Sequence, residues 1–141
     1  MRSFKDVQFI PNVKKALARV SNSEYKIVLV TNQSAIGRRI ISLEHANLIN
    51  VQIVRKIVDS GGRMDGVFLC PYHPNENCPC RKPAAGLFKE TAKRLSLHLN
   101  SSIVLVILGK IYAGQRAGVD RYIFILTGKG KDQIAHTQRT Q

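Results

Sequence analysis

Three cysteines and a histidine gather in one short stretch of this sequence, together with a pair of basic residues. The stretch runs from Cys70 to Pro83 and holds all three cysteines of the chain and one of its four histidines. A structural Zn²⁺ takes four nitrogen or sulfur donors in a tetrahedron, and three cysteines with one histidine are an ordinary donor set. The spacing therefore predicts zinc ligands among the soft donors of the loop, which are Cys70, His73, Cys78 and Cys80.

Other states of these cysteines are weighed against the zinc site. An odd number of cysteines, two of them separated by one residue, argues against a disulfide scaffold. The alternative to bound zinc is a cluster of reduced, partly buried thiols. In either case the loop carries Arg81 and Lys82 directly after its last cysteine, so it presents a basic pair whose role must come from the rest of the chain.

The elements around this loop follow an alternating pattern. Short apolar runs at residues 25–30, 66–70, 102–108 and 122–126 predict strands, and the run at 25–30 is expected to be a buried parallel strand. Apolar residues at helical spacing predict helices at residues 13–20, 42–59, 87–97 and 113–117. The alternation indicates an α/β fold, a three-layer Rossmann-like parallel sheet with helices on both faces.

A polar segment follows the first of these strands. Thr31, Asn32 and Gln33 stand directly after the apolar run. Ligands of open α/β sheets bind beyond the carboxyl ends of the strands, so these residues are candidates for ligand binding. Arg38 and Arg39 follow in the same loop and are either substrate contacts or solvated surface.

The charge of the chain is strongly positive. Lys and Arg number 22 against 9 Asp and Glu, a net charge of +13. Such an excess is typical of proteins with a polyanion or a phosphorylated substrate as partner. The basic residues are spread along the chain and are not interleaved with aromatic residues as in single-strand binders. A nucleic acid is therefore the less favoured partner, and a small phosphate the more favoured.

Length and composition predict one domain at residues 1–130 followed by a polar tail at 131–141. No apolar run approaches the 18 or so residues that a membrane helix needs, so no membrane partner is expected. The first residues lack the apolar core of a signal peptide. These observations together predict a cytoplasmic protein.

Three motifs occur in order with helix-sized spacers between them. They are Val-Thr-Asn-Gln-Ser at 30–34, Gly-Gly-Arg-Met-Asp-Gly-Val-Phe-Leu-Cys-Pro at 61–71 and Cys-Pro-Cys-Arg-Lys-Pro at 78–83. From about Phe9 to Gly130 the chain resembles the haloacid dehalogenase superfamily. It is most similar to the zinc-bearing phosphatases of that superfamily, which act on the 7-phosphate of D-glycero-D-manno-heptose 1,7-bisphosphate or on histidinol phosphate.

The resemblance implies a chemistry for the motif residues. Such enzymes use an aspartate nucleophile that forms a phospho-aspartate, with Mg²⁺ bridging the phosphate and the nucleophile. Thr31 is then expected to hydrogen-bond the phosphoryl oxygens, with Asn32 as an added donor and Gln33 beside them. Lys82 would neutralise the charge of the phosphoryl group and Arg81 would meet substrate. Phosphoryl transfer depends mainly on positioning and charge stabilisation, and the zinc loop would hold this basic pair in place.

The sequence departs from the family pattern at three places. The nucleophile motif, Asp-x-Asp-Gly, is expected about twenty residues before Phe9, so the first strand and both catalytic aspartates are missing from this chain. If Gly109 is the glycine of the Mg²⁺-binding Gly-Asp motif, Lys110 replaces the acid, and in the register set by Ala113-Gly114 the acid positions fall on apolar residues or Lys110. Tyr72 stands where the family has its zinc-binding histidine, and His73 follows it.

Two functional hypotheses remain open at this stage. The first is a phosphatase by family whose chain, as given, lacks the attacking group and is expected to be inactive. The second is a non-catalytic module that binds a phosphate or a polyanion. A parallel sheet without its first strand leaves neighbouring strands unpaired, which predicts marginal stability or an oligomer that fills the gap.

Overall fold

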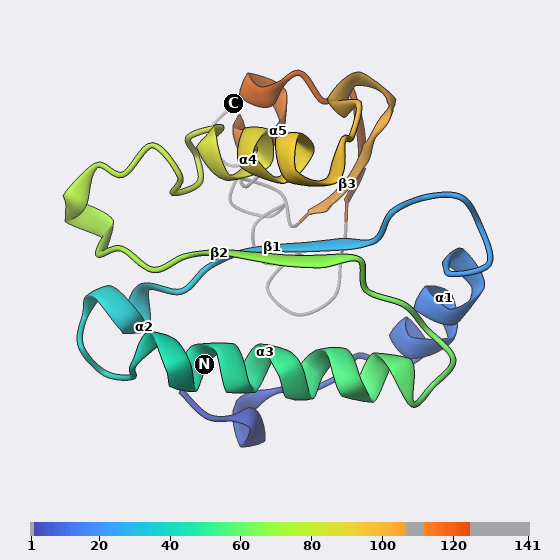
Figure 1. Cartoon of the computed structure of the whole chain (residues 1–141), viewed down its shortest axis with the longest axis horizontal. Coiled ribbons are helices and arrows are strands. Elements are labelled where there is room, and N and C mark those ends of the chain that lie inside the picture. Colours follow the sequence, from blue (N-terminus) through green and yellow to red (C-terminus); the bar gives the residue numbers. More distant parts are fainter. Residues whose placement is uncertain (1, 107–111, 125–141) are drawn as a thin grey trace, which may run out of the picture. The chain divides into compact units, whose positions relative to one another are not determined.

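The structure is a computed structural model that describes residues 2–106 and 112–124 (Figure 1). The chain divides into two compact units, Met1–Asn77 and Cys78–Gln141, and each is described by itself. The predicted polar tail at 131–141 and the Gly109-Lys110 pair lie outside the described residues. The prediction of one domain at 1–130 stays a prediction.

The first unit contains a parallel strand pair and its helices. Its elements in chain order are η1 (Phe4–Asp6), α1 (Val13–Val20), β1 (Val28–Asn32), α2 (Ser34–Gly37), α3 (Leu43–Val58), β2 (Gly66–Cys70) and η2 (Pro74–Glu76). Strands β1 and β2 pair in parallel from Val28 opposite Gly66 to Asn32 opposite Cys70. Helix α3 runs along this strand pair (Figure 1).

Helix α3 is stabilised by a capped first turn and by an apolar stripe on its inner face. The Ser42 hydroxyl accepts a hydrogen bond from the His45 N–H at 3.0 Å and so caps the first turn. Ala46, Ile49 and Ile57 are 1–3% exposed and form the apolar stripe that the helical spacing predicts. A capped helix with one apolar stripe supplies the core beneath the β1–β2 pair.

The second unit repeats the strand and helix alternation. Its elements are α4 (Gly86–Leu95), η3 (Leu99–Ser101), β3 (Ile103–Val106), α5 (Tyr112–Ala117) and β4 (Arg121–Phe124). Strands β3 and β4 pair in parallel from Ile103 opposite Arg121 to Val106 opposite Phe124. Among the described residues of this unit, buried side chains come from α4, from α5 and from the turn between α5 and β4, and they include Leu87, Phe88, Thr91, Ala113 and Val119.

The predicted parallel α/β class is confirmed, and four strands lie where apolar runs were found. In the described residues they form two separate two-stranded sheets, β1–β2 and β3–β4. None of the described helices is long and apolar enough to cross a membrane.

The first strand lies later in the chain than the sequence predicted. The expected strand at 25–30 begins at Val28 and ends at Asn32. The residues before it are held by side chains from the segment that leads into β2, since the Ile27 N–H donates to the Asp65 carboxylate at 2.7 Å and the Tyr25 carbonyl accepts from Arg63 at 2.6 Å. The strand therefore includes two of the polar residues that were expected to follow it.

Candidate functional site

The polar residues predicted to bind a ligand lie at the carboxyl end of β1. Thr31 and Asn32 are the last residues of that strand, and Asn32 pairs in register with Cys70 at the end of β2. The Gln33 N–H donates to the Cys70 carbonyl at 2.9 Å, and Gln33 is only 7% exposed. The candidate phosphate-binding residues of this unit and the first cysteine thus meet at one edge of the sheet.

A close backbone contact fixes the segments that follow the two strands. Gly37 ends α2, and a Cβ placed on it would lie 2.2 Å from the His73 backbone nitrogen and 2.6 Å from the Tyr72 carbonyl carbon. Only glycine allows this approach, because real Cβ atoms do not come so near to backbone atoms. The turn after β1 is therefore pressed directly onto the residues that follow Cys70.

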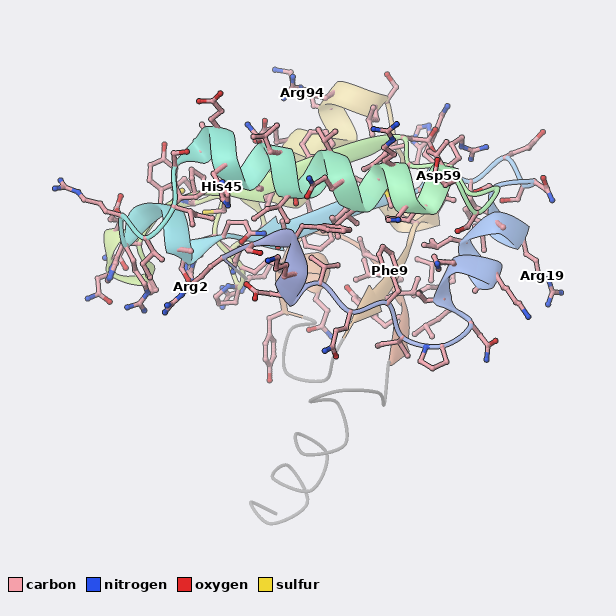
Figure 2. All side chains as sticks on the ribbon, turned by 90° about the horizontal axis from the view of Figure 1, so that it is seen from below. Arg2, Phe9, Arg19, His45, Asp59 and Arg94 are labelled. Atoms are coloured by element: carbon pink, nitrogen blue, oxygen red, sulfur yellow. The ribbon has the colours of Figure 1, made fainter. Side chains whose placement is uncertain are left out.

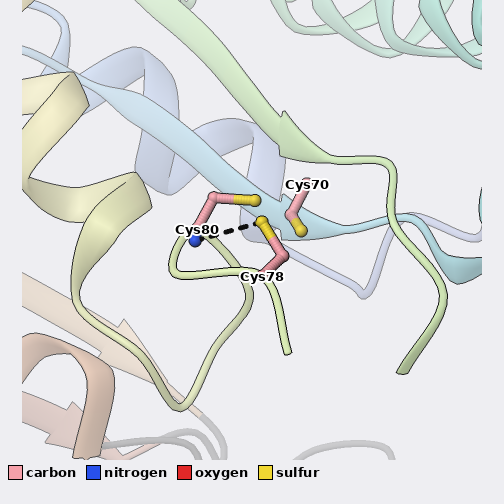
Figure 3. A group of neighbouring side chains, drawn as sticks. All are labelled: Cys70, Cys78 and Cys80. Atoms are coloured by element: carbon pink, nitrogen blue, oxygen red, sulfur yellow. Dashed lines mark hydrogen bonds between the residues drawn. The ribbon is translucent and has the colours of Figure 1, made fainter. Parts of the chain in front are cut away.

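The three cysteines form one group (Figure 3). Their Sγ atoms all lie within 4.8 Å of one another, and none is in a disulfide. Cys70 is fully buried, whereas Cys78 and Cys80 are half-buried. The Cys80 N–H donates to the Cys78 Sγ at 3.3 Å. Three thiols at this separation suit a soft metal ion as a common partner.

The predicted fourth ligand has a different role in the structure. The Nδ1 atom of His73 accepts a hydrogen bond from the Asn75 N–H at 3.2 Å, and the His73 N–H donates to Glu76 Oε1 at 2.9 Å. These reciprocal bonds cap η2. In the described part of the chain, the metal-capable group holds the three cysteines and neither His73 nor a carboxylate. Its assignment as a zinc ligand stays a prediction.

The basic pair follows the cysteines in a series of hydrogen-bonded turns. The Arg81 N–H donates to the Cys78 carbonyl at 3.1 Å, and the Ala84 N–H donates to the Arg81 carbonyl at 2.8 Å. The Gly86 N–H closes the series on the Pro79 carbonyl at 3.0 Å. Arg81 and Lys82 are half-buried. Backbone hydrogen bonds therefore restrict the main chain on both sides of the pair.

Arg63 and Asp65 form a brace, a role that the sequence motifs did not predict. It joins the segments that lead into β1 and β2. Arg63 bonds Asp65 at 3.0 Å and also donates to the carbonyls of Ser21 and Tyr25. Burial raises the pKa of the Asp65 carboxyl, but the hydrogen bonds from Ile27 and Arg63 outweigh it and hold that pKa below its usual value. The spacing of Arg63 and Asp65 just before an apolar strand was the available signal.

Comparison with known proteins identifies related phosphatases. A model of the family described as polynucleotide kinase 3 phosphatase matches residues 1–139. The D-glycero-beta-D-manno-heptose-1,7-bisphosphate 7-phosphatase of Haemophilus ducreyi is 35% identical in an alignment of 132 positions that covers 88% of this chain and 72% of that protein.

Two solved structures share the fold. A D,D-heptose 1,7-bisphosphate phosphatase from Bordetella bronchiseptica, complexed with magnesium and phosphate, superposes with a TM-score of 0.88 at 29% identity. The match covers 96% of this chain and 75% of that one. A HAD-like phosphatase structure from Mesorhizobium loti gives a TM-score of 0.81 at 27% identity, over 90% of this chain and 65% of that one.

The parallel α/β units have the phosphatase fold of the haloacid dehalogenase superfamily. Within that class, the chain belongs to the polynucleotide kinase 3 phosphatase family. The resemblance inferred from the three sequence motifs is therefore confirmed.

Proposed function

We propose that this chain binds a phosphorylated sugar of the heptose bisphosphate type at the carboxyl end of β1. The observation that carries the proposal is the register of the β1–β2 pair, which brings Thr31, Asn32 and Gln33 to the sheet edge where ligands of α/β folds bind. The relative from Haemophilus ducreyi named above supports this substrate class. Histidinol phosphate is the alternative substrate.

Each residue has a distinct role in this proposal. Thr31 donates its hydroxyl to a phosphoryl oxygen, and the Asn32 and Gln33 amides add polar contacts. Lys82 neutralises the charge of the phosphoryl group, and Arg81 meets the rest of the substrate. Fixed donors and cations stabilise the charge that phosphoryl transfer develops, so the same residues would serve binding and catalysis.

The attacking group of a phospho-aspartate mechanism has no counterpart in these residues. The 141 residues contain no Asp-x-Asp pair and no carboxylate between Glu90 and Asp120. They therefore do not fit the Mg²⁺ site of the family, and no step is assigned to that ion. A covalent mechanism without its nucleophile retains little activity, so we propose that these residues bind substrate without turning it over.

Zinc fits the structure better than magnesium does. Cys70, Cys78 and Cys80 would hold the ion through three thiolates, with a fourth donor from His73 after a backbone shift or from solvent. When bound, the ion would act as a structural cross-link and not as a Lewis acid. In this role it would fix the turn that carries Arg81 and Lys82. A cytoplasmic location belongs to the same proposal.

The experiment is a calorimetric titration of the chain with heptose 1,7-bisphosphate and with inorganic phosphate, each with and without Mg²⁺. We expect binding without Mg²⁺, and a loss of at least about tenfold in affinity for Lys82→Ala, since a charge-assisted hydrogen bond contributes about 1.5–3 kcal/mol. Lys89→Ala, an exposed lysine of α4, is the matched control and should bind like the parent.

Two outcomes would contradict this proposal at different points. Equal affinity of Lys82→Ala, Lys89→Ala and the parent would remove the basic pair from the site. Clear release of phosphate from heptose 1,7-bisphosphate by the purified chain would show that turnover does not need an Asp-x-Asp pair within these residues.

The net charge of +13 favours a second candidate, a non-catalytic module for a polyanion such as a nucleic acid. Such binding depends strongly on salt because counterions are released. A salt-dependent mobility shift on DNA or RNA, together with no response to phosphosugars, would select this candidate. Phosphosugar binding with no shift on nucleic acid would reject it.

A further inference from the structure

Helix α3 carries apolar side chains on the face turned away from the core. Leu48 is 56% exposed and Val51 is 61% exposed, whereas Ala46, Ile49 and Ile57 of the same helix are buried. With about 3.6 residues per turn, the two exposed residues lie on the side opposite the buried stripe. A surface helix ordinarily places charged or polar residues there, so this face is available for a partner.

The exposed apolar face is hollowed and extended. An open hollow is lined by residues of α3 alone, which are Leu43, Glu44, Asn47, Leu48 and Val51. Leu43 at one end of the helix is 49% exposed and Val58 at the other end is 52% exposed. The face therefore runs along the length of α3, with polar groups between the apolar ones.

The N-terminal segment does not account for this face. It contacts α3 elsewhere, through a hydrogen bond of 3.0 Å between the Arg2 carbonyl and the His45 Nε2 atom (Figure 2). On a helix of about 3.6 residues per turn, His45 is displaced from Leu48 and Val51 towards the buried stripe. Leu48 and Val51 are therefore exposed even though the N-terminal segment contacts α3.

The charges on this face are arranged with a two-fold symmetry. Glu44 lies four residues before Leu48, and Arg55 lies four residues after Val51. Two α3 helices packed antiparallel about the midpoint between Ile49 and Asn50 place Leu48 of one copy opposite Val51 of the other. The same operation places Glu44 opposite Arg55 at both ends, and a self-complementary patch of this kind suits a two-fold dimer.

We propose that the outer face of α3 is a homodimer interface, in which two copies of the chain pack their α3 helices antiparallel. The apolar pair at the centre supplies the driving force, and the Glu44–Arg55 pairs fix the direction of packing. An anionic membrane surface would favour a polar face rich in lysine and arginine, whereas this helix pairs an acid at one end with a base at the other. Because one helix face is a small contact, the expected dissociation constant is on the order of 10 μM.

The test is sedimentation equilibrium of the whole chain across a wide concentration range. Val51→Lys should raise the dimer dissociation constant by at least tenfold, because it brings two cations into the apolar centre. Val20→Lys is the matched control, since Val20 is an exposed valine (44%) on another helix, α1. It should leave the dimer unchanged.

A charge exchange tests the direction of packing. Glu44→Arg alone should weaken the dimer, since it faces Arg55 of the other copy, and Glu44→Arg combined with Arg55→Glu should restore it. Circular dichroism on each variant checks that α3 remains folded. A chain that stays monomeric at all concentrations, a Val51→Lys effect no larger than that of Val20→Lys, or no restoration by the double exchange would overturn the proposal. Binding to anionic vesicles by a monomeric chain would overturn it in favour of a membrane surface.

Discussion

The contact between Gly37 and the residues after Cys70 can be tested by one added methyl group. In Gly37→Ala the new Cβ would lie 2.2 Å from the His73 nitrogen, 2.6 Å from the Tyr72 carbonyl carbon and 2.8 Å from the His73 Cα. All three are backbone atoms, so no side chain can rotate away. Since non-bonded heavy atoms prefer about 3.5–4.0 Å, the two segments must separate by about 1 Å.

The expected cost follows from this displacement. Overpacking a close contact typically costs about 1–3 kcal/mol, and alanine has a better helix propensity than glycine by about 1 kcal/mol. The backbone at Gly37 needs no left-handed conformation, so the steric term is the one that opposes the substitution. We expect a net loss of up to about 2 kcal/mol in unfolding free energy. The residues after Cys70 should also move, which would weaken Cd²⁺ or Zn²⁺ binding by the cysteines.

The assay is urea unfolding followed by circular dichroism, with a Cd²⁺ titration of the thiols on the same samples. Gly118→Ala is the comparison, since Gly118 has a φ of +93° and a Cβ added to it would meet nothing within 4 Å. That variant should lose about 1–2 kcal/mol through its left-handed backbone alone and keep its metal affinity. If Gly37→Ala kept both its stability and its metal affinity, the close contact would not hold the loop.

Further substitutions address the brace, the core and the metal group. Asp65→Asn should lower the unfolding free energy by about 1–2 kcal/mol near neutral pH. Because the folded pKa of Asp65 is lowered, this difference should be present above its ordinary pKa and disappear as the pH falls through the lower folded value, as followed by pH-dependent urea unfolding. Asn50 is 4% exposed, and neither polar atom of its side-chain amide has a hydrogen-bond partner among the described residues. Asn50→Leu should therefore raise the melting temperature through a gain of roughly 1 kcal/mol or more in unfolding free energy. A lower melting temperature would contradict this and indicate that the amide has a partner. Tyr72→His should raise Zn²⁺ affinity at least tenfold in a chelator competition, by adding a nitrogen donor beside three thiolates, whereas a loss of affinity in His73→Ala would show that His73 already supplies that donor.

The sequence was informative where one residue type has few uses. Cysteines at 70, 78 and 80 could be grouped from spacing alone, and the structure places their sulfur atoms within 4.8 Å of one another. The strands could be located because β-branched apolar runs between polar segments have few other interpretations. Parallel pairing followed from the helices between them, since a parallel pair needs a crossover.

Element ends were less accessible because they depend on distant side chains. The start of β1 is set by Asp65 and Arg63, which lie more than thirty residues later in the chain. Helix α4 was expected to reach residue 97 but ends at Leu95, because Ser96 adopts a left-handed conformation with a φ of 53°. No pattern of apolar residues nearby indicates the start of β1 or the end of α4.

The degree of burial could not be predicted from hydrophobicity. The runs that form β3 and β4 were expected to be apolar strands of a parallel sheet, and in the structure Leu105 is 63% exposed and Ile123 is 51% exposed. Parallel strands are usually covered on both faces. An apolar run therefore indicates a strand, but its burial depends on which other segments pack against it.

The side chains proposed to attract a phosphate are cations and neutral donors, whereas the carboxylates of a phosphatase site in this family are anionic. A phosphatase site of this class combines cations and donors that attract the phosphate with carboxylates that repel it, and the metal ion offsets that repulsion. Thr31, Asn32, Arg81 and Lys82 are the residues proposed to hold the phosphate, and the 141 residues contain no Asp-x-Asp pair. If these four residues bind a phosphate as proposed, the 141 residues supply the attracting groups of such a site without the repelling ones. Phosphate binding by these residues is therefore expected to need no bound cation, which the titrations with and without Mg²⁺ test directly.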